Sequence, residues 1–135
     1  MPDPIEGACL CGAVRWRFEG APDGATACNC TACRRSGALW IYGYEGQGVS
    51  ATGQTTAFAR GPAAPLTFNF CPTCGNLVFW RGLSTDDQGR RRMGLNLRLA
   101  EPTEAVMSIP IDHFDGLGAF EDLPRDGRSV RDMWF

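Results

Sequence analysis

The sequence predicts a mainly β fold, and three observations lead to this prediction. Short runs in which apolar and polar residues alternate recur along the chain, as expected for half-buried strands. The chain contains 17 glycines and 9 prolines, which favours many turns over long helices. Its 135 residues match the size of one domain that can bury a proper core. We therefore expect residues 1–135 to form a single domain.

The N-terminal half is predicted to contain three strands and one short helix. Val14, Trp16 and Phe18 alternate with charged residues, which predicts the first strand. A turn-forming stretch over residues 21–24 follows it. The other elements expected here are a strand over 25–28, a turn or two of helix over 31–36 that breaks at Gly37, and a strand over 39–42.

The C-terminal half is predicted to contain further strands. Met93, Leu95, Leu97 and Leu99 occupy alternate positions, which is the clearest strand pattern in the chain. The polar stretch over residues 84–92 is typical of a solvated hairpin loop. The remaining predicted strands cover 55–60, 66–70 and 77–80, with one more that includes Val106, Ile109 and Ile111.

The charge of the chain excludes several classes of function. The formal net charge is −2, so we expect no nucleic acid as a partner. All 13 basic residues are arginine, which excludes a Schiff-base lysine and a P-loop lysine. No apolar run approaches the roughly 20 residues that span a bilayer, so we expect no membrane. The first residues lack the pattern of a secretory leader, which predicts a location in the reducing cytoplasm.

Seven cysteines in three clusters are the feature that points to a function. An odd number of cysteines cannot pair completely as disulfides, and clustered cysteines in the cytoplasm more often bind metal. Zinc needs four ligands in a tetrahedron, and cysteines one or two residues apart supply them where the chain turns tightly. Gly12 and Gly75 permit such turns. The clusters are Cys9-Leu10-Cys11, Cys28-Asn29-Cys30-Thr31-Ala32-Cys33 and Cys71-Pro72-Thr73-Cys74.

The number of cysteines fits two zinc sites. Two pairs close one structural site with four thiolates, and three remaining thiolates leave the open position that is typical of catalytic zinc. The spacing alone leaves open which clusters combine, although the triple cluster supplies three ligands locally. The alternatives are a second structural zinc completed by His113 or a carboxylate, a redox-active pair at Cys71 and Cys74, and plain buried thiols. A thiolate-rich site is soft and favours a sulfur ligand over water.

Two arginines directly follow the triple cluster. Arg34 and Arg35 offset part of its negative charge, and arginine side chains bind carboxylates through two parallel hydrogen bonds. The alternative is that both are ordinary exposed residues. We therefore treat them as candidate substrate-binding residues.

These cysteine motifs resemble a known family. In order and spacing, three segments are similar to those of the glutathione-dependent formaldehyde-activating (GFA, or CENP-V/GFA) family, and the similarity covers residues 7–80. The segments are Gly7-Ala8-Cys9-Leu10-Cys11-Gly12, Cys28-Asn29-Cys30-Thr31-Ala32-Cys33-Arg34 and Phe70-Cys71-Pro72-Thr73-Cys74-Gly75. The resemblance implies an Mss4-like, mainly β fold with antiparallel sheets built around a zinc knuckle. It also implies a structural zinc on Cys9, Cys11, Cys71 and Cys74, and a second, catalytic zinc on Cys28, Cys30 and Cys33.

The resemblance implies an activity as well. The family is named for condensing formaldehyde with glutathione to S-(hydroxymethyl)glutathione, and the reverse step is that of a carbon–sulfur lyase. We therefore expect a zinc-dependent lyase or synthase that acts on a small, glutathione-like thiol and an aldehyde such as formaldehyde. The alternatives are a non-catalytic, zinc-stabilised binding module and a thiol-based redox or zinc sensor. Many relatives have histidine where this chain has Asn29, which cannot carry a proton.

Overall fold

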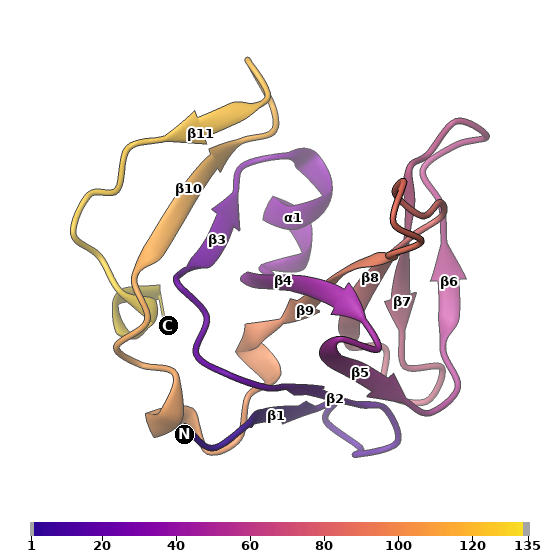
Figure 1. The fold of residues 1–135 in the computed structure, drawn as a ribbon, viewed down its shortest axis with the longest axis horizontal. Coiled ribbons are helices and arrows are strands. Elements are labelled where there is room, and N and C mark those ends of the chain that lie inside the picture. The colour runs from indigo at the N-terminus through magenta and orange to yellow at the C-terminus, as the bar shows by residue number, and fades with distance from the viewer. Residues whose placement is uncertain (1, 134–135) are drawn as a thin grey trace.

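The computed structural model describes residues 2–133 and confirms that the fold is mainly β (Figure 1). The helix α1 spans Thr31–Ser36, and three short 3₁₀ helices are η1 (Leu97–Leu99), η2 (Thr103–Ala105) and η3 (Val130–Met133). The strands are β1 (Ile5–Ala8), β2 (Arg15–Phe18), β3 (Ala25–Cys28), β4 (Trp40–Glu45), β5 (Gly48–Thr52), β6 (Thr56–Phe58), β7 (Leu66–Phe70), β8 (Leu77–Gly82), β9 (Arg92–Asn96), β10 (Ile111–Asp115) and β11 (Glu121–Leu123).

The strands pair into one mixed sheet. Its main path runs β1-β2-β5-β4-β9-β8-β7-β6, and β3 branches from β4 to pair with β10, which in turn pairs with β11. Most neighbours are antiparallel, as expected, but β3–β10 and β4–β5 are parallel. The β3–β10 register places Phe114 opposite Cys28, and Figure 1 shows these two strands side by side next to α1. This pairing brings the C-terminal part of the chain to the end of β3.

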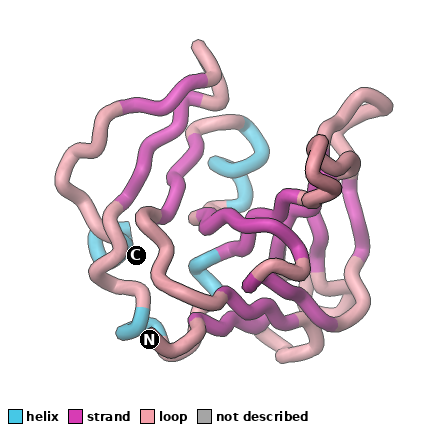
Figure 2. Tube along the Cα trace, in the orientation of Figure 1, coloured by secondary structure: helices cyan, strands magenta, loops and turns pink. Residues whose placement is uncertain are grey.

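The structure differs from the sequence predictions at a few elements. The strand predicted over 93–99 ends at Asn96, where the chain continues as η1 (Figure 2). The Asn96 side chain accepts a hydrogen bond from the backbone N–H of Arg98 and so caps this turn. The sequence does not predict β1 and β5, because their glycine-containing segments lack a clear alternation. The last predicted strand also begins later than expected, at Ile111.

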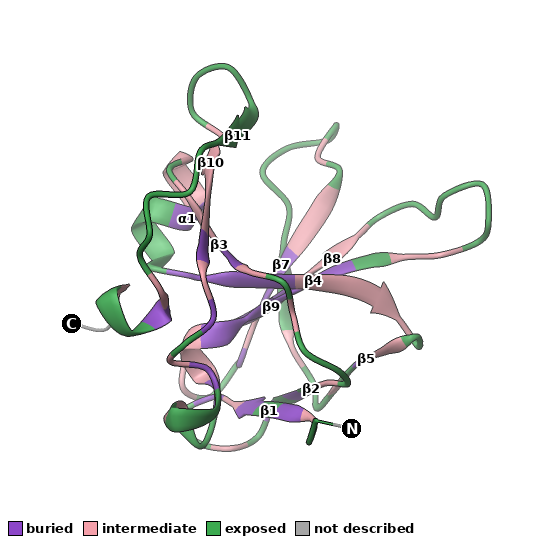
Figure 3. Ribbon diagram, turned by 60° about the vertical axis from the view of Figure 1, so that its left-hand side comes forward, coloured by how far each residue is buried: buried purple, intermediate pink, exposed green. Residues whose placement is uncertain are grey.

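The interior consists of two hydrophobic clusters, and each includes cysteines from a different part of the sequence. The larger cluster contains Trp16 together with Cys9 and Cys71. The smaller cluster contains Trp40 and Cys33. Figure 3 shows the buried segments concentrated where β4, β8 and β9 meet, whereas β11 is exposed. No helix in the described part of the chain is long and apolar enough to cross a membrane.

Candidate metal centres

Four sulfur atoms meet between two hairpins. Cys9 and Cys11 lie in the connection from β1 to β2, and Cys71 and Cys74 lie in the connection from β7 to β8. The four Sγ atoms lie within 4.8 Å of one another. The Cys9–Cys11 and Cys11–Cys71 sulfur distances are 3.7 and 3.5 Å. Sulfurs bound to zinc at 2.3 Å in a regular tetrahedron stand about 3.8 Å apart, so this spacing fits the metal.

In each half of this four-sulfur group, a glycine after the second cysteine donates its backbone N–H to the carbonyl oxygen of the first cysteine. In one half, the backbone N–H of Gly12 donates to the carbonyl oxygen of Cys9 (2.9 Å). In the other, the N–H of Gly75 donates to the carbonyl oxygen of Cys71 (2.9 Å). Both glycines have positive φ angles, 80° and 78°, which side chains rarely tolerate. This confirms the turns expected at Gly12 and Gly75.

Backbone donors surround the four-sulfur group and favour thiolates. The N–H of Val14 donates to the Sγ of Cys9 (3.3 Å). The backbone N–H groups of Asn76 and Cys11 lower the pKa of the Cys74 thiol to about 6. The backbone N–H of Ala13 lowers the pKa of Cys11, but hydrogen bonding to Cys71, desolvation, and hydrogen bonding to Cys9 and Cys74 together outweigh it and raise the pKa to about 11. Crowded sulfurs that cannot all ionise by themselves are a donor set that suits a dication.

Three further sulfur atoms gather at the start of α1. Cys28 ends β3, Cys30 is the N-cap of α1 and Cys33 lies within the helix. Their Sγ atoms lie within 4.8 Å of one another, and no fourth Cys, His, Asp or Glu of residues 2–133 joins them. The spacing Cys-x-Cys-x-x-Cys brings them together because the helix begins at the middle cysteine. We refer to these residues as the three-sulfur group.

Hydrogen-bond donors also point at the three-sulfur group. The backbone N–H of Cys33 donates to the Sγ of Cys30 (3.3 Å), and that of Cys30 donates to the Sγ of Cys28 (3.4 Å). The indole N–H of Trp40 donates to the Sγ of Cys33 (3.3 Å). Burial nevertheless raises the pKa of Cys33, because the apolar cluster around it disfavours charge. A cation shared by three sulfurs would offset this cost.

A turn from the C-terminal part of the chain covers the three-sulfur group. The amide of Asn29 donates to the Oδ1 atom of Asp115 (3.0 Å) and accepts from the backbone N–H of Leu117 (3.0 Å). Backbone N–H groups of residues 118 and 119 also donate to Asp115. Led by that of Ala119, these bonds hold the pKa of Asp115 below its ordinary value.

Gly116 lies in the same turn, close to the three-sulfur group. A Cβ atom on Gly116 would lie 2.7 Å from the Sγ of Cys28. Only glycine therefore fits at this point of the β10–β11 turn.

A pocket of about 500 Å³ opens beside the three-sulfur group. Cys30 and Gly116 form part of its wall, and residues 60–66 form most of the rest. Arg34 and Arg35, the candidate substrate-binding residues, are exposed in the last turn of α1 and do not line this pocket.

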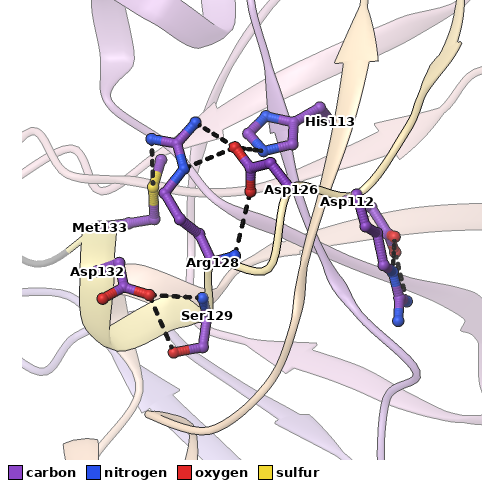
Figure 4. Close-up of polar contacts among 8 residues, drawn as sticks. Asp112, His113, Asp126, Arg128, Ser129, Asp132 and Met133 are labelled. Atoms are coloured by element: carbon purple, nitrogen blue, oxygen red, sulfur yellow. Dashed lines mark hydrogen bonds and ion pairs between the residues drawn. The ribbon is translucent and has the colours of Figure 1, made fainter.

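His113 belongs to a separate polar cluster (Figure 4). Its Nε2 atom lies 3.1 Å from the Oδ2 atom of Asp126. The Arg128 side chain donates to the same carboxylate and strongly lowers the pKa of Asp126. His113 therefore joins neither sulfur group, and the structure gives no support to it as a fourth zinc ligand.

Sequence reasoning identified the cysteines but missed the residues that support them. Trp40 is a core aromatic residue by its pattern, and nothing in the sequence indicates that its N–H meets a sulfur. Asp115 and Gly116 have the composition of a turn, but their contacts with Asn29 and Cys28 join residues more than 80 positions apart. Such contacts leave no local signal in the sequence.

Comparisons with known proteins bear on both the family and the fold. A family model described as "Glutathione-dependent formaldehyde-activating enzyme" matches residues 4–106, which include all seven cysteines. A crystal structure of a Rhodobacter sphaeroides protein, solved as a structural genomics target, resembles this fold with a TM-score of 0.56. The two chains are 24% identical, and the match covers 72% of this chain and 88% of that one. The search among curated proteins gives no match.

Proposed function

This chain belongs to the glutathione-dependent formaldehyde-activating family, and from this premise we propose that it is a zinc-dependent enzyme that makes or breaks a carbon–sulfur bond. Its substrates are a small thiol, glutathione being the one in the family's name, and an aldehyde such as formaldehyde. In the condensing direction the S–H bond breaks, a bond forms between sulfur and the carbonyl carbon, and the proton ends on the carbonyl oxygen. No electrons are gained or lost, so the reaction needs no redox cofactor.

One observation carries this proposal. The three-sulfur group offers three ligands, no fourth described side chain joins them, and a pocket opens at Cys30. Three protein ligands with one remaining position are typical of catalytic zinc. A zinc ion held by Cys28, Cys30 and Cys33 would lower the pKa of a substrate thiol and keep it as the nucleophilic thiolate.

The residues around the three-sulfur group have their own tasks in this proposal. The indole N–H of Trp40 and the backbone N–H groups of Cys30 and Cys33 stabilise the thiolate form of the ligands. The apolar cluster behind them limits access of water, which strengthens these electrostatic interactions. The turn held by Asn29 and Asp115 keeps the cover over Cys28 in place.

We assign a structural role to the four-sulfur group. Cys9, Cys11, Cys71 and Cys74 already supply four ligands, so a zinc ion there has no position for a substrate. Such an ion ties the β1–β2 connection to the β7–β8 connection across 60 residues. We also place the protein in the reducing cytoplasm, because seven unpaired thiols are preserved there.

The test combines a metal count with turnover. Reductively purified protein should contain two zinc ions per chain, and Cys28→Ser should retain one. X-ray absorption should report an additional sulfur neighbour when a substrate thiol is added. The adduct of a thiol and formaldehyde, followed by NMR exchange over a panel that includes glutathione, should form faster than in buffer with the native protein and not with Cys28→Ser.

The other outcomes assign the alternative functions. Two zinc ions with no acceleration for any thiol would support a zinc-stabilised binding module and overturn the enzyme. Release of one zinc ion on mild oxidation, again without turnover, would support a sensor.

A further inference from the structure

The pocket beside the three-sulfur group lies between two segments that are far apart in the sequence. Residues 60–66, in the connection from β6 to β7, form one side, and the β10–β11 turn contributes Gly116 and Phe120 from the other. In Figure 1 both segments lie along the upper edge of the molecule. The volume of about 500 Å³ is within the range of small-molecule sites.

The lining of this pocket is apolar except at one point. The connection between β6 and β7 presents Pro62-Ala63-Ala64-Pro65, followed by Leu66, and Phe68 lies beyond it. Arg60 is the one charged residue among those that line the pocket, and it forms no ion pair with any described carboxylate. A ligand with an apolar body and a single negative charge complements such a surface, whereas each further charge would lack a partner.

Phe120 adds a second observation at the edge of the same pocket. Its backbone φ is 56°, a left-handed conformation that is rare for a bulky residue and that often marks a functional position. The residue is 75% exposed, and its ring lies edge-on against that of Phe114, with 4.9 Å between the ring centres. An aromatic ring kept exposed in a strained conformation has a use if a ligand packs against it.

The pocket borders the three-sulfur group at Cys30. Cys30 forms part of its wall, and Gly116, on the opposite side, is in contact range of Cys28 and Cys30. This pocket therefore offers room for the remaining atoms of a molecule whose sulfur completes the three-sulfur group.

We propose that the thiol substrate is an apolar alkyl or aryl thiol with one carboxylate, bound with its body against residues 62–66 and Phe120 and its carboxylate at Arg60. This inference rests on the proposed function and narrows it. Glutathione has two carboxylates and an ammonium group at neutral pH. Arg60 is the one charged residue that lines the pocket, so two of these three charges would lack a partner there. In the reaction, the S–H bond of this thiol breaks, the C–S bond to the aldehyde carbon forms, and the carbonyl oxygen takes the proton.

The test measures by calorimetry how tightly the zinc-loaded protein binds three thiols: 6-mercaptohexanoate, its methyl ester and glutathione. The acid should bind about tenfold more tightly than either of the others, which is the effect of one charge-assisted hydrogen bond. The Arg60→Gln variant should bind the acid and the ester equally tightly, and its affinity for the ester should equal that of the native protein. Arg131→Gln, a change at an exposed arginine outside the pocket, should alter neither.

A second variant adds a negative charge to the wall of the pocket. Ala63 is exposed, so the Ala63→Glu variant should fold normally. It should bind the acid more weakly than the native protein does, with a smaller loss of affinity for the ester. Glutathione binding as tightly as 6-mercaptohexanoate, or an equal effect of Arg60→Gln on acid and ester, would overturn the inference. Binding with the expected pattern but without turnover would instead overturn the proposed enzyme and leave this ligand class in place.

Discussion

The indole N–H of Trp40 points at the Sγ atom of Cys33, with 3.3 Å between nitrogen and sulfur. Trp40 is 1% exposed and begins β4, the strand that follows α1. Burial raises the pKa of the Cys33 thiol, and the hydrogen bond from Trp40 acts to lower it. A single side chain therefore packs in the smaller hydrophobic cluster and donates a hydrogen bond to the three-sulfur group.

Replacement of Trp40 by phenylalanine separates these two tasks. Trp40→Phe keeps most of the apolar volume but removes the N–H, so zinc affinity at the three-sulfur group should fall about 10- to 100-fold. Competition with a chelator measures this affinity. Trp16→Phe is the matched control, because that indole is equally buried but donates to the backbone oxygen of Asn96 instead. Equal losses of zinc affinity in both variants would contradict the role given to Trp40.

Removal of one cysteine from each group should have different effects on stability. Cys74→Ser removes a ligand of the four-sulfur group, and the free energy of unfolding should fall by several kcal/mol, because bound metal stabilises only the folded state. The Cys33→Ser variant should retain the structural zinc, and its free energy of unfolding should fall much less than that of Cys74→Ser. Metal analysis and denaturant unfolding of both variants check this order, and the reverse order would exchange the two assignments.

A methyl group at Gly116 should disturb the cover of the three-sulfur group. The added Cβ atom would overlap the Sγ of Cys28, so Gly116→Ala must displace the turn or the sulfur. We expect about tenfold weaker zinc binding there, with the structural zinc unchanged. Leu117→Ala is the control, because it shortens an exposed side chain of the same turn and keeps the backbone N–H that donates to Asn29. Unchanged zinc binding in Gly116→Ala would show that the turn does not constrain the metal ligands.

Zinc binding to the four-sulfur group should release protons in a pH-dependent way. The lowered pKa of Cys74, about 6, means that this thiol is already ionised at pH 8 in the metal-free protein, whereas Cys11, at about 11, is still protonated. Zinc affinity should therefore rise as pH rises, but with fewer than four protons released per ion. Calorimetry of Cys28→Ser in buffers of different ionisation enthalpy counts these protons. Release of four protons at pH 8 would show that Cys74 is not ionised beforehand.

The sequence predicts those parts of the site that are local. Cys28, Cys30 and Cys33 meet because a helix begins between them, and residues two or three positions apart come together in any such turn. The pairing of Cys9 and Cys11 with Cys71 and Cys74 is different. It spans 60 residues and depends on how two hairpins pack, so spacing leaves it open and only the family resemblance suggests it.

Two of the residues that the sequence did not indicate, Asp115 and Gly116, depend on one long-range contact. The pairing of β3 with β10 sets the position of Asp115 and Gly116 against Asn29. Asn29 does not titrate as a histidine would, but its amide donates to Asp115 and accepts from the backbone N–H of Leu117, a role that a motif comparison does not show. Pattern reasoning cannot find such a partner, because nothing near Asn29 in the sequence records it.

The sulfur atoms and their cover come from separate stretches of the chain. All seven cysteines lie within residues 4–106, whereas the β10–β11 turn and Phe120 lie after them. Changes of length or composition in surface turns are tolerated far better than changes in ligands. One wall of the pocket, the one that contains Phe120, can therefore change in sequence without altering the order or spacing of the seven cysteines.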